Sequence, residues 1–115
     1  MSHRDHDKLD YTRYATVTAP PTATLSGSRT YNIIPVSTAS GDVSLGTLGT
    51  PADLGLKAGQ ILIFRKVTTD GNHVTWTGSM EGVTDTLRLR YHFSVDLAQI
   101  ALLVNSANTY ELLVH

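Results

Sequence analysis

The fold is decided by residues 61–77, ILIFRKVTTDGNHVTWT, in which two β-rich segments flank a turn. The apolar run Ile61-Leu62-Ile63-Phe64 is typical of a strand buried on both faces. Asp70-Gly71-Asn72 favours a tight hairpin loop, because Gly and Asn tolerate a positive φ. Beyond this turn, Trp76 and His73 fall on opposite faces of a strand. The stretch therefore predicts a β-hairpin with Trp76 in a core or an interface and His73 facing solvent.

The rest of the chain extends this β pattern. Apolar and polar side chains alternate with a period of two over residues 86–97 and again over 110–114. The glycine-rich segment 46–60 reads as a loop rather than a helix. A single helical turn over 98–104 is the one helical alternative. We therefore expect an all-β fold, a small antiparallel β-sandwich or barrel of the jelly-roll type, with an extended N-terminal arm.

Composition narrows the function. The 115 residues suffice for one domain with one core. Charged residues make up 17% of the chain and the formal net charge is −1, so no basic field for nucleic acid is expected. No apolar run approaches the roughly 18 residues that predict a membrane-spanning helix, and the N-terminal stretch MSHRDHDKLD lacks the apolar core of a signal peptide. The chain has no cysteine, which excludes disulfides.

The N-terminal part differs from the remainder. Residues 1–10 are rich in charge and histidine, and such a stretch cannot bury itself. Pro20-Pro21 favours an extended connector. Residues 1–24 are therefore expected to form an extended anchoring arm that becomes ordered by docking to another molecule, and residues 25–115 are expected to form the β body.

No catalytic or metal-binding pattern is recognisable. None of the histidines has the spacing of a zinc enzyme, and Gly-x-Ser-x-Gly is absent. Glu81 and Asp85 are four residues apart in a glycine-rich loop, where they read as turn formers rather than as an acid/base pair. The glycines of 46–60 lack the lysine and helix of a phosphate-binding loop. We expect no enzyme activity, no cofactor and no metal site.

Five short motifs, taken in order, resemble a recurrent module of tailed-bacteriophage virion proteins. The motifs are LGTP at 48–51, LKAGQILIFRKV at 56–67, DGNHVT at 70–75, GVTD at 82–85 and NTYELL at 108–113. The family includes tail fibres, head fibres and capsid decoration proteins, which are commonly homotrimers. The resemblance implies a structural accessory protein on the outer surface of the virion, assembled in the host cytoplasm.

Within this family, the short chain without a repetitive stalk favours a capsid decoration (cement) protein that binds the major capsid protein or another virion protein and stabilises the shell. The arm would then be the anchor, with aromatic and aliphatic contacts and a basic rim. Its candidate anchoring residues are Arg4, Lys8, Tyr11, Arg13, Tyr14 and Val17.

Two alternatives remain. One is a head-fibre, tail-fibre or spike tip that binds a host surface receptor. The other is a carbohydrate-binding module, in which aromatic rings stack on a sugar and Asp70, Asn72 and His73 supply hydrogen bonds. The candidates for a subunit interface or a host glycan contact are Trp76, Tyr91, Phe93 and Tyr110.

Overall fold

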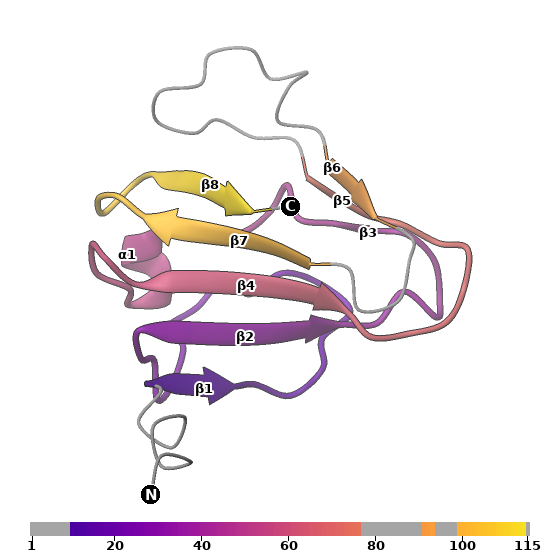
Figure 1. Ribbon diagram of the computed structural model, residues 1–115, viewed down its shortest axis with the longest axis horizontal. Coiled ribbons are helices and arrows are strands. Elements are labelled where there is room, and N and C mark those ends of the chain that lie inside the picture. The colour runs from indigo at the N-terminus through magenta and orange to yellow at the C-terminus, as the bar shows by residue number, and fades with distance from the viewer. Residues whose placement is uncertain (1–9, 77–90, 94–98, 115) are drawn as a thin grey trace, which may run out of the picture.

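The computed structural model describes residues 10–76, 91–93 and 99–114, which form an all-β fold with one short helix (Figure 1). The larger sheet has the strand order β1-β2-β4-β7-β8. Its strands are β1 (Tyr11–Arg13), β2 (Tyr31–Val36), β4 (Ile61–Lys66), β7 (Gln99–Val104) and β8 (Tyr110–Val114). The smaller sheet has the order β3-β5-β6. Its strands are β3 (Val43–Ser44), β5 (Val74–Trp76) and β6 (Tyr91–Phe93). The expected all-β class is confirmed.

The expectation of antiparallel pairing throughout is wrong, because both sheets are mixed. β2 is parallel to β1 and to β4, and β3 is parallel to β5. The pairs β4–β7, β5–β6 and β7–β8 are antiparallel. Parallel neighbours need a long crossover, and the segments 14–30 and 37–60 provide one between β1 and β2 and between β2 and β4. The short turn 105–109 joins β7 to β8 as antiparallel neighbours.

The hairpin predicted around Asp70-Gly71-Asn72 is also wrong. β4 pairs with β2 and β7, whereas β5 pairs with β3 and β6, so the two segments belong to different sheets. The side chains of Asp70 and Asn72 bind the loop after β2 instead of closing a ladder between β4 and β5. Gly71 lacks the positive φ that a tight hairpin loop requires. The turn residues therefore serve as a link between sheets.

Both sheets contribute to one core. In β4 the buried residues Leu62, Phe64 and Lys66 alternate with side chains of intermediate exposure, so only one face of this strand is fully buried and the expectation of two buried faces is wrong. Phe64 packs in the same hydrophobic cluster as Val43 of β3 and Val74 of β5. The core therefore covers one face of the larger sheet, and the opposite face lies outside this core.

The segment 46–60, expected to be a loop, contains the one-turn helix α1 (Pro51–Leu54). The Thr50 side chain accepts a hydrogen bond from the Asp53 backbone N–H, and the Asp53 carboxylate accepts one from the Thr50 N–H, which forms a capping box. Gly55 ends the turn at φ 74°. A helix of one turn is too short to leave a periodic pattern in the sequence. The helical alternative for 98–104 is wrong, because Gln99–Val104 is strand β7.

The described part of the N-terminal segment lies against the body. β1 forms the edge of the larger sheet beside β2 (Figure 1). The backbone N–H groups of Tyr14 and Val17 donate to carbonyls of β2 at 2.9 Å, and that of Leu25 donates to Leu54 at 2.9 Å. Tyr14 and Val17 pack against the core. The boundary expected between residues 24 and 25 therefore does not divide the described chain into two units.

Candidate functional site

The larger sheet has an outer face, which is the surface that points away from the core. The strand register aligns one row of outward side chains across all five strands, and a second row follows two residues further along. The first row comprises Tyr11, Tyr31, Ile61, Leu103 and Glu111. The second comprises Arg13, Ile33, Ile63 and Ala101. The third comprises Pro35, Arg65 and Gln99.

Exposed apolar surface is concentrated on this outer face. Tyr11, Tyr31 and Leu113 are exposed by 52%, 37% and 44%, and they are the large hydrophobic side chains that the described residues expose. Tyr11 and Tyr31 are direct neighbours on β1 and β2. Leu113 points outward because its neighbour Leu112 packs against the core. A contiguous apolar surface with a polar rim is typical of a protein-binding site.

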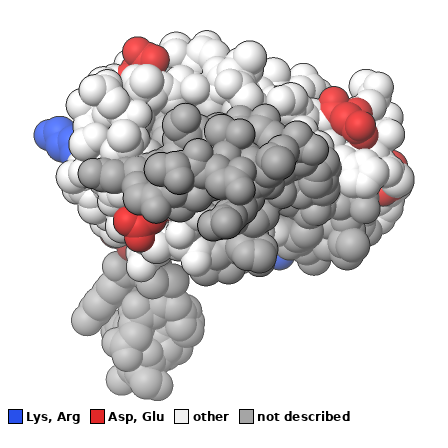
Figure 2. Space-filling view, turned by 90° about the horizontal axis from the view of Figure 1, so that it is seen from above, with Lys and Arg blue, Asp and Glu red and all other residues white. Residues whose placement is uncertain are grey.

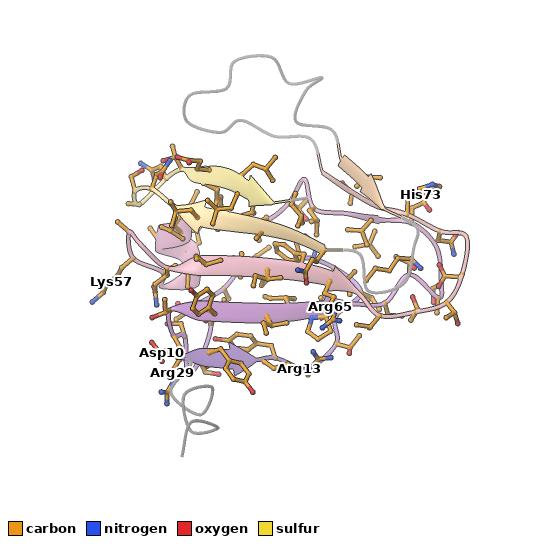
Figure 3. The ribbon with its side chains drawn as sticks, in the orientation of Figure 1. Asp10, Arg13, Arg29, Lys57, Arg65 and His73 are labelled. Carbon is orange, nitrogen blue, oxygen red and sulfur yellow. The ribbon has the colours of Figure 1, made fainter. Side chains whose placement is uncertain are left out.

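Charged side chains surround this apolar centre. Arg13 and Arg65 lie over the same part of the sheet (Figure 3). The Nε atom of Arg65 is buried and has no hydrogen-bond partner within the described structure. Glu111 lies on β8 at the opposite edge, where its Oε1 accepts a hydrogen bond from Asn105 at 3.2 Å. The outer face thus has basic groups at one end and a carboxylate at the other.

The start of β1 is clamped to the chain before β2. The Asp10 carboxylate accepts hydrogen bonds from the Thr30 backbone N–H at 3.0 Å, the Thr30 hydroxyl at 2.7 Å and the Arg29 guanidinium at 3.3 Å. Figure 3 shows Asp10 and Arg29 side by side. The hydrogen bond from the Thr30 hydroxyl is the largest cause that holds the pKa of Asp10 below its ordinary value. These contacts hold the start of β1 against the residues that precede β2.

Asn32 of β2 joins neighbouring segments from inside the sheet. Its side chain is fully buried, and its Oδ1 accepts from the Arg29 backbone N–H at 3.0 Å and from the Tyr14 hydroxyl at 3.2 Å. Its Nδ2 donates to the carbonyls of Arg29 and Ile61 at 2.7 and 3.2 Å. The buried amide is therefore satisfied on both sides, as a buried polar group requires.

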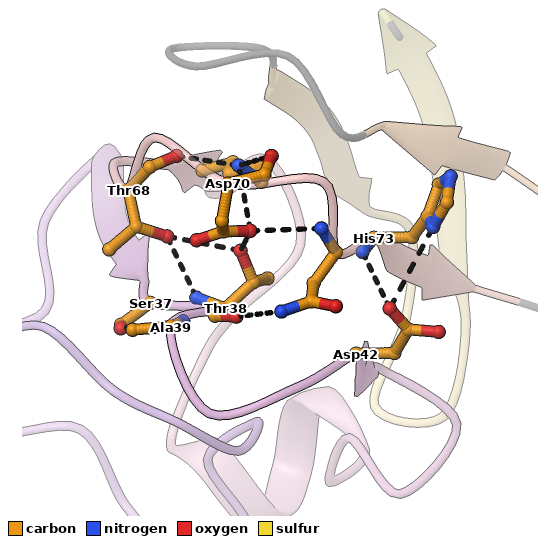
Figure 4. Close-up of polar contacts among 9 residues, drawn as sticks. Ser37, Thr38, Ala39, Asp42, Thr68, Asp70 and His73 are labelled. Atoms are coloured by element: carbon orange, nitrogen blue, oxygen red, sulfur yellow. Dashed lines mark hydrogen bonds and ion pairs between the residues drawn. The ribbon is translucent and has the colours of Figure 1, made fainter.

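A second polar cluster links the loops that follow β2 and β4 (Figure 4). Lys66 is fully buried, and its Nζ donates to the Thr68 carbonyl at 2.5 Å and lies 3.4 Å from Asp70 Oδ1. The Thr38 hydroxyl donates to Asp70 Oδ1 at 2.6 Å, and Asn72 Nδ2 donates to the Thr38 carbonyl at 2.8 Å. These groups contact one another, so the cluster holds the loops together.

Acid is expected to weaken this cluster. The hydrogen bond from Thr38 is the largest cause that lowers the pKa of Asp70 from 3.8 to about 2. A lowered folded-state pKa contributes stability above the unfolded value, and this contribution is lost as the pH falls from about 4 toward about 2. The gap in thermal midpoint between the native chain and Asp70→Asn should therefore shrink across that range. A gap that stays constant from pH 6 to pH 2 would contradict this assignment.

Asp42 and His73 make a further contact, which joins the segment before β3 to the segment before β5. The His73 backbone N–H donates to Asp42 Oδ1 at 2.8 Å, and His73 Nδ1 lies 3.7 Å from the same oxygen (Figure 4). The His73 side chain is 45% exposed. Asp70, Asn72 and His73, which the sequence suggested as hydrogen-bonding partners of a sugar, all make contacts between loops.

The predicted anchoring residues fall into three groups. Tyr11 and Arg13 lie on the outer face, whereas Tyr14 and Val17 pack against the core of their own chain. The other two, Arg4 and Lys8, lie outside the described residues.

The aromatic residues predicted as interface or glycan contacts lie in different sheets. Tyr110 is buried, and its hydroxyl donates to the Gly49 carbonyl at 2.7 Å, so its prediction as a surface contact is wrong. Burial raises the pKa of Tyr110 well above its ordinary value. Trp76 is the register partner of Tyr91, and Phe93 is that of Val74 in the smaller sheet. The strand positions of Trp76 and Tyr91 are therefore paired in the smaller sheet, whereas Tyr110 lies in the larger sheet.

The described residues show neither a metal-binding cluster of His, Asp and Glu nor a helix long and apolar enough to cross a membrane. Seen from above, their charged side chains are scattered and do not gather into a patch of one sign (Figure 2). Comparison with protein families, curated proteins and solved structures returned no match for this chain. The outer face is therefore the candidate functional site, because it carries the exposed apolar side chains and the charged groups around them.

Proposed function

We propose that this chain is a structural accessory protein of a tailed-phage virion, and specifically a capsid decoration protein. In this proposal the body is a small β-sandwich closed over one core, and residues 1–9 anchor it to the shell. The observation that carries the proposal is the docking of residues 10–25 along the body, which begins at the Asp10 clamp.

This docking suits a load-bearing attachment. A decoration protein must transmit force from its anchor to its body without unfolding. β1 lies parallel to β2, and the evenly spaced, slanted hydrogen bonds of a parallel pair join the two strands, so a pull along β1 loads them together in shear. The Asp10 carboxylate adds three hydrogen bonds at the point where the force would enter. Asp10 is thereby fixed at a defined edge of the sheet.

The chemistry of residues 1–9 supports an anchoring role. Arg4 and Lys8 supply basic groups that would pair with carboxylates on the shell, and Leu9 supplies an apolar contact. In the body, Lys66, Asp70 and Asp10 are used in contacts that hold the fold together. These uses favour a structural role over a catalytic one.

The test compares purified particles that lack the protein with the same particles after addition of the full chain, of a chain lacking residues 1–9, or of Lys57→Glu. Lys57 is exposed and lies at the end of the molecule away from His73, so Lys57→Glu is a control for a surface charge change outside residues 1–9 (Figure 3). Quantitative mass spectrometry should find the full chain and the control bound in a copy number close to that of the shell protein, or a sizeable fraction of it. The truncated chain should bind at least about tenfold less.

The thermal midpoints of all three chains should agree, which separates a binding defect from a folding defect. Absence of the full chain from the particles would overturn the proposal. A copy number of a few per cent of the shell protein would instead indicate a fibre or spike at special positions.

A further inference from the structure

We propose that the outer face binds the outer face of a second copy of this chain about a two-fold axis that runs nearly along β4. This inference goes beyond the proposed function and does not depend on it, because both partners are the same chain and no particle is needed. It differs from the homotrimer that the family resemblance implies, since a two-fold contact joins a surface to itself.

The first argument is the composition of the face. Its centre is apolar, with Ile33, Ile61, Ile63 and Leu103 half-buried on the central strands. Tyr11, Tyr31 and Leu113, the exposed hydrophobic side chains of the described chain, lie around this centre. A second sheet packed on this surface would remove all of them from water, which is the main driving force for association.

The second argument is charge complementarity. Glu111 on β8 and Arg13 on β1 occupy opposite edge strands, four strand spacings or about 19 Å apart, and are offset along the strands by about 7 Å. A two-fold axis through the middle of β4 exchanges these two positions. Each copy then places its Glu111 against Arg13 of the other copy, so one contact is made twice.

The third argument is the packing angle that this exchange requires. The axis must be tilted by about 20° from β4, so the strands of the two copies cross at about 40°. Sheets that pack face to face prefer an angle of about 30° between their strands. Pairing Glu111 with Arg65 instead would make the strands cross at roughly 110°, which is nearer the orthogonal arrangement of about 90° than the aligned one. An aligned packing of the two sheets therefore pairs Glu111 with Arg13.

The same axis brings the exposed Gln99 of the second copy over Arg65, whose side chain is partly exposed. The amide oxygen of Gln99 is a suitable acceptor for the terminal guanidinium N–H groups of Arg65. Leu113 of one copy meets Pro35 of the other, and Tyr31 meets Ile61 and Leu103. The exposed hydrophobic residues and the Arg65 side chain are thus covered together.

The size of the face sets the expected strength. The five strands of the larger sheet have three to six residues each and span at most about 19 by 20 Å, or roughly 400 Å² in projection. A standard interface buries about 800 Å² per partner. We therefore expect a weak dimer, with a dissociation constant on the order of tens of micromolar.

Sedimentation velocity of the full chain from about 5 to 500 µM tests the proposal. The native chain and Lys57→Glu should pass from monomer to dimer across this range. Arg13→Glu and Glu111→Arg should each raise the dissociation constant at least about tenfold, because the contact is made twice. The double variant Arg13→Glu/Glu111→Arg should restore dimerisation to within about threefold of the native value.

Thermal unfolding confirms that each variant is folded before its association is compared. A native chain that stays monomeric at 500 µM, or that forms a trimer, would overturn the two-fold dimer. Failure of the folded double variant to regain association would overturn the pairing of Arg13 with Glu111. Attachment to particles plays no part in this measurement, so its outcome is independent of the proposed function.

Discussion

A chain that lacks residues 1–20 is expected to lose most of its stability. This deletion removes strand β1, the hydrogen bonds from Tyr14 and Val17 to β2, and the buried Pro20. Tyr14 and Val17 also pack against the core, and loss of each apolar contact costs about 2 kcal/mol. The total loss of at least about 4 kcal/mol is a large part of the roughly 5–15 kcal/mol that stabilises a typical domain.

The measurement is thermal or denaturant unfolding of the two truncated chains. The chain lacking residues 1–9 is the matched control, because it keeps the Asp10 clamp and all of β1. It should unfold within a few degrees of the full chain, whereas the shorter chain should have a midpoint lower by about 15 °C or fail to fold. If removal of residues 1–20 left the midpoint unchanged, β1 and its contacts would not stabilise the body.

This expectation shows why the sequence alone misjudged the N-terminal segment. Residues 11–24 have irregular apolar spacing and a proline pair, so they predict an extended chain without predicting its partner. The structure shows that this partner is the chain's own β2 edge. Period-two alternation identifies a strand, but it does not indicate the neighbour with which that strand pairs.

The β segments themselves were predictable. Ile61–Lys66 and Tyr110–Val114 are strands where apolar or alternating patterns predicted them. Their pairing was not predictable from local pattern, because parallel neighbours are joined by long connections whose course depends on tertiary contacts. The turn signal at Asp70-Gly71-Asn72 failed for the same reason, since a loop distant in sequence binds its side chains.

Two buried polar residues were missed although the sequence contains a signal for them. Asn32 and Lys66 occupy inward positions in strands whose other inward residues are apolar, such as Ile34 and Phe64. A polar side chain at such a position must find partners inside the protein. The sequence can therefore mark these residues as buried hydrogen-bonding sites, but their partners depend on the fold.

Replacement of Asn32 by alanine tests this interpretation and should destabilise the protein far more than replacement of an exposed polar residue. The change removes two donated and two accepted hydrogen bonds from partners on Tyr14, Arg29 and Ile61. Of these partners, the Arg29 carbonyl keeps a hydrogen bond from Gln60 Nε2 at 2.9 Å. Several unsatisfied groups of this kind cost about 3 kcal/mol together. For a domain of this size, that loss lowers the thermal midpoint by roughly 12–20 °C.

Asn105→Ala is the matched control, because Asn105 makes a side-chain hydrogen bond to Glu111 near the surface. It should lower the midpoint by less than about 4 °C. Asn32→Asp keeps both acceptor contacts but places a buried carboxylate oxygen against the carbonyls of Arg29 and Ile61, so at neutral pH its midpoint should fall at least as far as that of Asn32→Ala. Equal midpoints for Asn32→Ala and Asn105→Ala would show that Asn32 does not hold β1, β2 and β4 together. In that case the stability of the β1 edge would rest on Tyr14, Val17 and the Asp10 clamp.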